Sequence, residues 1–276
     1  MKKLILSKIF VYPIKSIAGI SLDSSNVTTH GLKYDRRWLL VDENNVFITQ
    51  RLYPEMALIQ PSIINDTFLL KHKTKNINQI SIPAFLSEGK ELSVKIWNDY
   101  CSAFHYNSDV DQWFSEVLNT KCKLVYMPDD SNRYIDKTYA KNNEIVSFAD
   151  GFPFLIIGQS SLDDLNSRLK TPIPITRFRP NFVFTGGEPF EEDYLKKIKI
   201  GDVSFSVVKP CARCVITTTN QETSERSKEP LLTLSGYRRV NNKVLFGQNL
   251  IHHNLGKIKL GNKITILKKI KTNLYK

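Results

Sequence analysis

Short runs of hydrophobic residues, many alternating with polar ones, recur along the whole chain and predict β-strands. Alternation places every second side chain on one face of a strand, so each run has one face suited to burial. We expect strands at residues 4–11, 38–41, 46–49, 57–59, 67–71, 92–97, 122–126, 154–157 and 182–184.

Two glycine turns predict β-hairpins in the second half of the chain. Residues 197–200 and 203–208 flank Gly201-Asp202, and residues 257–260 and 263–267 flank Gly261-Asn262. Glycine at the first turn position tolerates the positive φ that a two-residue hairpin turn requires. We therefore expect each pair of runs to form one antiparallel hairpin.

Only two segments show a helical spacing of hydrophobic residues. The first begins at Ser108, a candidate N-cap, and carries one apolar stripe formed by Val110, Trp113, Phe114, Val117 and Leu118. The second covers residues 160–169, with leucines at 162, 165 and 169 on one face. Many strands and few helices predict a mainly β, β-barrel-like fold.

A chain of 276 residues has room for one large domain or two ordinary ones. The clearest break in the pattern is the polar stretch 128–144, which is rich in Asp, Asn and Lys. It is typical of a linker or a mobile surface segment. We place the boundary at its start, giving one domain over residues 1–127 and a second over residues 128–276.

The net charge of +12 favours anionic ligands or acidic partners. Basic residues are spread along the chain, and no nucleic-acid-binding motif accompanies them, so nucleic acid is an unlikely main partner. No hydrophobic run is long enough to span a bilayer. The basic N-terminus lacks the cleavage site of a signal peptide, so we expect a soluble cytoplasmic protein without membrane contact.

Four cysteines are too few for a disulfide framework, and two of them form the segment Cys211-Ala212-Arg213-Cys214. Several interpretations remain open. A structural zinc site needs four ligands, and a redox dithiol is usual at a helix start. Two inert thiols in the core are the plainest interpretation. The last is a single thiolate that binds a redox metal, favoured by the charge of Arg213.

Two further segments combine basic and amide side chains. The first is Arg177-Phe178-Arg179-Pro180-Asn181, where we expect an extended segment with both arginines on one face. Guanidinium groups suit phosphates and the polar edges of heterocycles. The second comprises Lys15, Ser16 and Arg36, which together suit an anion-binding cradle. Solvent-exposed charges are the alternative for both segments.

Together these segments resemble the MOSC family over nearly the whole chain. Residues 12–16, 31–32 and 35–38, reading YPIKS, GL and DRRW, resemble its N-terminal β-barrel domain. The chain resembles the MOSC domain itself in segments 150–153, 161–166, 177–181, 211–214, 228–231 and 246–249. Similarity extends to the mitochondrial amidoxime-reducing components and their bacterial counterparts. The resemblance implies an N-terminal MOSC β-barrel domain followed by a MOSC β-barrel domain.

The resemblance also implies a molybdenum–molybdopterin cofactor and a residue set that holds it. Cys214 is the implied metal ligand and catalytic residue. Lys15, Ser16 and Arg36 are implied at the phosphate end of the cofactor. Arg179 and Asn181 are implied at the pterin, and the set is completed by two residues of matching cofactor-lining segments, Asp150 and Arg213.

The activity implied by the resemblance is the reduction of N-hydroxylated compounds, such as N-hydroxylated bases and amidoximes. The alternative is a non-catalytic cofactor carrier or sulfur-relay protein. No cysteine follows Cys214, so we expect no iron–sulfur cluster in this chain and electrons from a separate donor protein. Relatives often carry Asp-Pro-x-Thr-Gly after the metal-binding cysteine, whereas residues 219–224 read TNQETS here.

Overall fold

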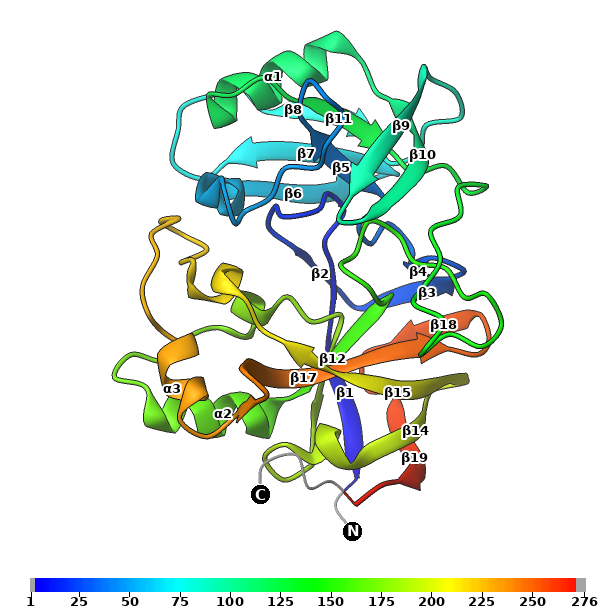
Figure 1. Cartoon of the computed structure of the whole chain (residues 1–276), viewed down its shortest axis with the longest axis vertical. Coiled ribbons are helices and arrows are strands. Elements are labelled where there is room, and N and C mark those ends of the chain that lie inside the picture. The colour runs from blue at the N-terminus through cyan, green and yellow to red at the C-terminus, as the bar shows by residue number, and fades with distance from the viewer. Residues whose placement is uncertain (1–2, 272–276) are drawn as a thin grey trace.

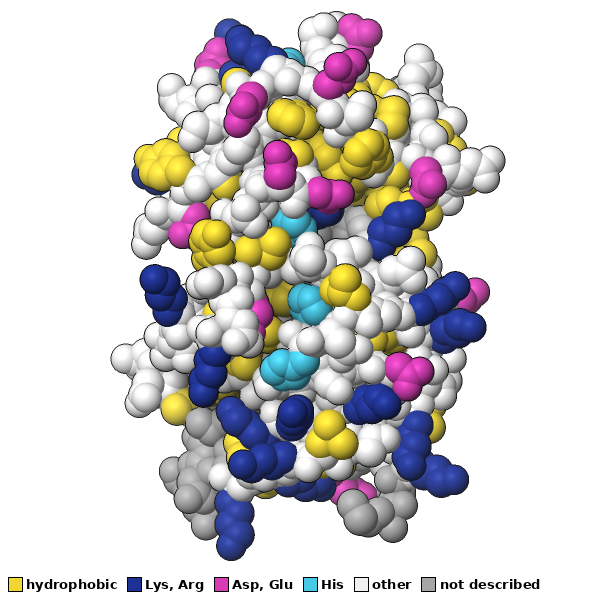
Figure 2. Space-filling view, turned by 90° about the vertical axis from the view of Figure 1, so that its right-hand side faces the viewer, with side chains coloured by type: hydrophobic (Ala, Val, Ile, Leu, Met, Phe, Trp, Pro, Cys, Tyr) yellow, Lys and Arg dark blue, Asp and Glu magenta, His cyan; other side chains and the backbone are white. Residues whose placement is uncertain are grey.

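The computed structural model describes residues 3–271 and shows two β-rich halves stacked along the long axis of the molecule (Figure 1). The described part of the chain begins and ends at the bottom of the lower half. Strands dominate and helices are few, which confirms the expected mainly β fold. Basic side chains gather over the lower half on the face shown in Figure 2.

The lower half is a closed β-barrel of seven strands. Around the barrel they run β12 (Phe154–Gly158), β13 (Phe182–Thr185), β1 (Leu4–Val11), β19 (Lys263–Lys269), β14 (Leu195–Ile200), β15 (Val203–Ala212) and β17 (Lys243–His252). Pairing of β12 with β17 closes the ring, which leaves no open edge between these strands. β2 (Ile20–Leu22) extends β1, and β16 (Arg239–Val240) extends β17.

The barrel is filled by alternate side chains of its strands. Leu6 and Ile9 of β1 are fully buried against three stacked or edge-on rings, Phe154, Phe182 and Phe205. Burying large aromatic and aliphatic side chains supplies most of the stabilisation of such a core. The first strand of the chain is therefore part of the barrel that the second half of the sequence builds.

The upper half contains two sheets and a helix. One sheet orders β5 (Trp38–Val41), β11 (Lys123–Tyr126), β10 (Asp99–His105) and β9 (Glu91–Ile96), and the other orders β6 (Ile59–Ile64), β7 (Thr67–His72) and β8 (Ile80–Pro83). Trp38 and Leu40 face the second sheet and helix α1 (Ser108–Leu118). Leu39 and Val41 face a smaller cluster on the opposite side.

Two more α-helices are described, α2 (Gln159–Arg168) and α3 (Leu231–Ser235), with short 3-10 turns η1 (Pro54–Leu58), η2 (Ile175–Phe178), η3 (Glu191–Tyr194) and η4 (Val215–Thr218). The apolar stripe of α1 is buried as predicted. Its N-cap is Asn107, whose side chain accepts a hydrogen bond from Val110 N at 2.9 Å. Ser108 is instead the first helical residue.

One of the two expected hairpins is wrong. The hairpin across Gly201 is present, with Ile200 opposite Val203 and a φ of 57° at the glycine. The runs around Gly261 do not pair with each other: β18 (Gly256–Lys259) pairs with β3 (Ser24–Thr28), which pairs with β4 (Gly31–Leu32). Gly261 N donates to Leu6 O, so this turn joins two different sheets.

Two short expected strands are also wrong. Residues 57–59 fall mostly in η1, where Pro54 fits the first turn of a helix because it lacks an N–H. Residues 46–49 form only isolated bridges, which involve Val46 and Phe47. This segment instead leads into the turn that carries Thr49 and Arg51.

The polar stretch 128–144 is not a mobile linker. Ser131, Arg133 and Ile135 are buried at alternate positions, so their side chains point into the protein. Polar composition was misleading here because the buried positions carry polar groups with internal partners. The division at residues 127 and 128 stays a prediction. Within residues 3–271, no helix combines the length and the hydrophobicity needed to cross a membrane.

Candidate functional site

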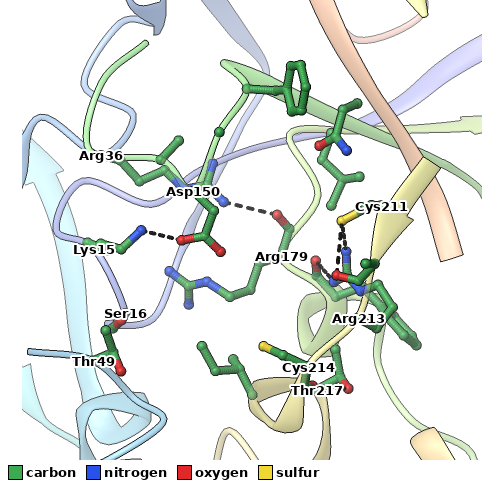
Figure 3. Close-up of a pocket in the computed structure, with 18 of the residues that line it drawn as sticks. Lys15, Ser16, Arg36, Thr49, Asp150, Arg179, Cys211, Arg213, Cys214 and Thr217 are labelled. Carbon is green, nitrogen blue, oxygen red and sulfur yellow. Dashed lines mark hydrogen bonds and ion pairs between the residues drawn. The ribbon is translucent and has the colours of Figure 1, made fainter. Parts of the chain in front are cut away.

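A cleft between the two halves gathers all the residues predicted for the site. It encloses about 830 Å³, its open mouth included. Its wall contains Lys15, Ser16, Arg36, Asp150, Arg179, Asn181, Arg213 and Cys214. In Figure 3 the Arg179 side chain runs between the Lys15–Asp150 pair and Cys214. The structure thus brings these residues together, while their roles toward a ligand stay predictions.

Lys15 and Ser16 lie in the segment after β1, where the chain leaves the barrel. Ser16 has a φ of 73°, a left-handed conformation that non-glycine residues rarely adopt. Gln50 holds this turn, because its side-chain amide donates to Ser16 O at 2.9 Å. The Ser16 hydroxyl makes no hydrogen bond within residues 3–271, so it remains available at the cleft.

Lys15 is 6% exposed and forms a close ion pair with Asp150. Its ammonium lies 2.5 Å from the carboxylate and donates to Phe148 O at 2.8 Å. Asp150 belongs to the segment that precedes β12, so the pair joins two parts of the chain that are far apart in sequence. The Asp150 side chain is 63% exposed and faces the open cleft.

Both members of this pair have shifted pKa values. Desolvation lowers the pKa of Lys15 to about 8, although Asp150 acts in the opposite direction. Desolvation would raise the pKa of Asp150, but the charges of Lys15, Arg51 and Arg36 outweigh it and hold that pKa well below its ordinary value. The carboxylate is therefore charged at neutral pH, and the Lys15 ammonium, with its pKa near 8, still holds most of its charge there.

Arg133 holds the segment that carries Asp150. It is 5% exposed and donates to the carbonyl oxygens of Ser147, Ala149 and Asp150 and to the Asp99 carboxylate. These four hydrogen bonds tie the start of β10 to the segment before β12. Sequence analysis missed this residue because it lies in the stretch interpreted as a linker.

Arg36 is held inside the cleft wall by internal partners. Its guanidinium donates to Asp35 at 2.5 Å, to Asn181 Oδ1 at 3.3 Å and to Arg179 O at 3.1 Å. The guanidinium carbon lies 4.5 Å from the centre of the Tyr12 ring. Arg36 therefore braces the loop that carries Arg179.

Arg179 projects into the cleft, but from a turn and not from an extended segment. Residues 175–178 form η2, and Arg179 ends it with a left-handed φ of 54°. The expectation that Arg177 and Arg179 share a face is wrong, since residues two apart in such a turn diverge. Arg177 donates to Thr217 O at 2.7 Å, whereas the Arg179 guanidinium lies over Tyr12, 4.2 Å from the ring centre.

Asn181 is 1% exposed and its amide is occupied by the protein itself. Its Oδ1 accepts from Leu155 N at 3.1 Å, and its Nδ2 donates to Phe10 O at 3.2 Å. These bonds join β1, β12 and β13 at the cleft. Little of the Asn181 amide therefore remains free to bind a ligand.

The two cysteines of the Cys-x-x-Cys segment differ in their surroundings. Cys211 lies within β15, and its sulfur accepts a hydrogen bond from Arg213 at 2.8 Å. Arg213 also donates to Phe178 O, while its Nε is buried without a partner. The orphaned Nε lies in the cleft wall and is a donor that a ligand could satisfy.

Cys214 is half-buried and lies at the start of η4. η4 begins directly after Cys214, and Cys214 O accepts from Thr217 N and Thr217 Oγ1. The turn fixes the backbone of Cys214 and leaves its thiol facing the cleft beside Thr217 (Figure 3). Two inert core thiols are therefore not what the structure contains.

Three cleft residues from the upper half were missed. Thr49, Arg51 and Trp97 line the same wall as Lys15 and Ser16. The guanidinium carbon of Arg51 lies 4.3 Å from the centre of the Trp97 ring. Thr49 ended a run that was expected to be a strand, and Arg51 and Trp97 belonged to no motif that the sequence analysis singled out.

Among residues 3–271, no three His, Cys, Asp or Glu side chains come together to hold a metal ion. A metal bound through Cys214 would need ligands from outside the chain. The single thiol, the orphaned Arg213 donor and the basic cleft suit an anionic cofactor that brings its own metal ligands. The residues present therefore fit the group that the sequence implied.

Comparison with known proteins identifies relatives of two kinds. Mitochondrial amidoxime-reducing component 1 of Mus musculus is 33% identical over 95% of this chain and 82% of its own length. The component of Homo sapiens is 29% identical over the same shares. Molybdenum cofactor sulfurase of Oryza sativa subsp. japonica is 34% identical over 88% of this chain but only 32% of its own length, so the chain spans about a third of that relative.

Two family models account for most of the chain. The MOSC N-terminal beta barrel domain matches residues 3–121, and the MOSC domain matches residues 143–265. The cleft lies between the segments that the two models cover, with Lys15 and Arg51 in the first and Arg179 and Cys214 in the second. Because of these matches and its similarity to the amidoxime-reducing components over most of their length, the chain belongs to the MOSC family.

Proposed function

We propose that this protein is a molybdenum cofactor-dependent oxidoreductase that reduces N-hydroxylated compounds with electrons from a separate donor protein. The observation that carries the proposal is the half-buried Cys214 thiol in one cleft with Lys15, Ser16 and Arg179. The names of the mouse and human relatives support reduction of amidoximes as the activity.

Each residue would bind the part of the cofactor that matches its charge and shape. Cys214 would bind the metal as a thiolate. Lys15 and Ser16 would bind the phosphate through charge-assisted hydrogen bonds. Arg179 would contact the polar edge of the pterin. Asn181 would hold together the backbone of the three strands that meet at the cleft.

When bound, the cofactor supplies a metal centre that exchanges two electrons and one oxygen atom with a substrate. The net reaction R–NHOH + 2e⁻ + 2H⁺ → R–NH₂ + H₂O breaks the N–O bond and consumes two protons. Protons must therefore reach the cleft from solvent. The open mouth beside the exposed Asp150 carboxylate provides that access.

A second candidate function is that of a non-catalytic cofactor carrier or sulfur-relay protein. The match to the rice molybdenum cofactor sulfurase is the observation in its favour. Both functions need the same cleft and the same thiol, so geometry alone favours neither. The length shared with the amidoxime-reducing components, 82% against 32%, makes reduction the better-supported proposal.

Turnover separates the two functions. Protein from a host that makes molybdopterin is incubated with an N-hydroxylated base and a chemically reduced viologen, with product measured by chromatography. An oxidoreductase converts the substrate repeatedly, and Cys214→Ala abolishes the conversion. A cofactor-loaded wild type that releases cofactor to a second protein but never turns over would be the carrier.

A further inference from the structure

We propose that Arg51 is the guanidinium that binds the phosphate group of the ligand in this cleft. The inference rests on the proposed function, and it assigns to Arg51 a role that the sequence motifs gave to Arg36. It follows from comparing which hydrogen-bond donors of the cleft arginines are already in use.

Arg36 has little capacity left for a ligand. Three of its five N–H groups donate to Asp35, Asn181 and the Arg179 carbonyl. Asp35 is 1% exposed and neutralises the charge at 2.5 Å. A phosphate would compete with a carboxylate that is already buried and paired, which disfavours Arg36 as its principal contact.

Arg51 presents the opposite situation. Its guanidinium forms no ion pair or hydrogen bond with any residue in the described range 3–271, and its Nε is buried without a partner. The group nevertheless lies over the Trp97 ring, with its guanidinium carbon 4.3 Å from the ring centre. Stacking on an aromatic ring fixes the plane of a guanidinium while leaving its N–H edges free to bind an anion.

The backbone of Arg51 is fixed from both halves of the molecule. Thr49 Oγ1 accepts from Arg51 N at 3.1 Å. Arg226, which follows Cys214 in the other half, donates to Gln50 O at 2.5 Å and to Arg51 O at 2.8 Å. The unused guanidinium therefore sits on a braced turn, and a preorganised donor loses less conformational entropy on binding.

Further donors line the same cleft as Arg51. The Ser16 hydroxyl is unpartnered, and the Thr49 hydroxyl, used only as an acceptor, keeps its hydrogen. Lys15 lines the cleft as well, and its ammonium is paired with the exposed Asp150 carboxylate. These residues line one wall of the cleft (Figure 3). A phosphate needs this combination of a planar fork, hydroxyl donors and an ammonium group.

The test is titration of the cofactor-free full chain with inorganic phosphate at low ionic strength, followed by ³¹P NMR. We expect Arg51→Gln to weaken binding roughly 10- to 100-fold, the range for losing hydrogen bonds between charged groups. Arg51→Lys keeps the charge without the planar fork and should fall between. The matched control is Arg168→Gln, because Arg168 also stacks 4.3 Å from an aromatic ring, that of Tyr237, but outside the cleft.

The control should bind phosphate like the wild type, and thermal unfolding should show that all variants are folded. Equal affinities of wild type and Arg51→Gln, or no saturable phosphate binding by the wild type, would overturn the inference. The molybdenum content of each protein separates this result from the proposed function. Wild type that loads molybdenum while Arg51→Gln binds phosphate normally would refute the role of Arg51 alone.

Discussion

The Lys15 ammonium lies 2.5 Å from the Asp150 carboxylate, where the segment after β1 meets the segment before β12. One partner is almost fully buried and the other faces solvent. The pair therefore places a pH-sensitive charge inside the cleft, at the point where these two segments of the chain meet.

Anion binding should weaken as pH rises through the titration range of Lys15. Burial lowers the pKa of this ammonium to about 8. Below that pH the group is positive and attracts an anion, and above it the attraction is lost. Phosphate affinity measured between pH 7.5 and 9.5 should fall in wild type and stay nearly constant in Lys15→Met. A flat wild-type profile would show that Lys15 carries no charge-dependent role.

Replacing Asp150 by Asn should move that titration to lower pH. Asp150 raises the pKa of Lys15 both through its charge and through a hydrogen bond, opposing desolvation. Without the carboxylate, desolvation acts unopposed and the ammonium loses its proton more readily. The midpoint of the affinity profile should shift below that of wild type, and an upward shift would contradict the pairing.

Arg133→Gln should destabilise the protein by roughly 2–4 kcal/mol, because three buried carbonyl oxygens and one carboxylate lose a charged donor. Urea unfolding followed by fluorescence gives the free energy directly. The exposed Arg168, replaced in the same way, serves as the comparison and should cause little change. Equal small effects of both variants would mean that Arg133 does not brace the cleft.

Glu192 should make stability depend on pH between about 4.5 and 7. Burial, followed by the charge of Asp193, raises the pKa of Glu192 from 4.5 to about 7. In this range the folded protein holds a proton that the unfolded chain has released, so the free energy of unfolding falls as pH rises. Glu192→Gln should remove that component. An unchanged slope in the variant, from urea unfolding at several pH values, would contradict the assignment.

Sequence reasoning was most successful where burial alone decided the structure. The strand at residues 4–11 and the apolar stripe of α1 were predicted correctly, because a buried face leaves its period in the sequence. The turn at Gly261 failed, because local turn chemistry does not determine which strands pair across the molecule. Residue spacing likewise could not reveal that β1 joins the barrel of the other half.

The same distinction applies to the cleft. Residues in recognisable motifs, such as Lys15 and Cys214, line one cleft. Arg51 and Arg133 were missed because their importance lies in what they contact. An arginine whose guanidinium has no hydrogen-bond partner among residues 3–271 looks, in a sequence, like one that donates four hydrogen bonds, and only the folded chain tells them apart.

The most direct measurement is the molybdenum content of protein purified anaerobically from a host that makes molybdopterin, in wild type, Cys214→Ala and Cys211→Ala. Ligation through Cys214 predicts stoichiometric metal in wild type, its loss in Cys214→Ala and its retention in Cys211→Ala. Wild type without molybdenum, or metal that persists in Cys214→Ala, would contradict the account.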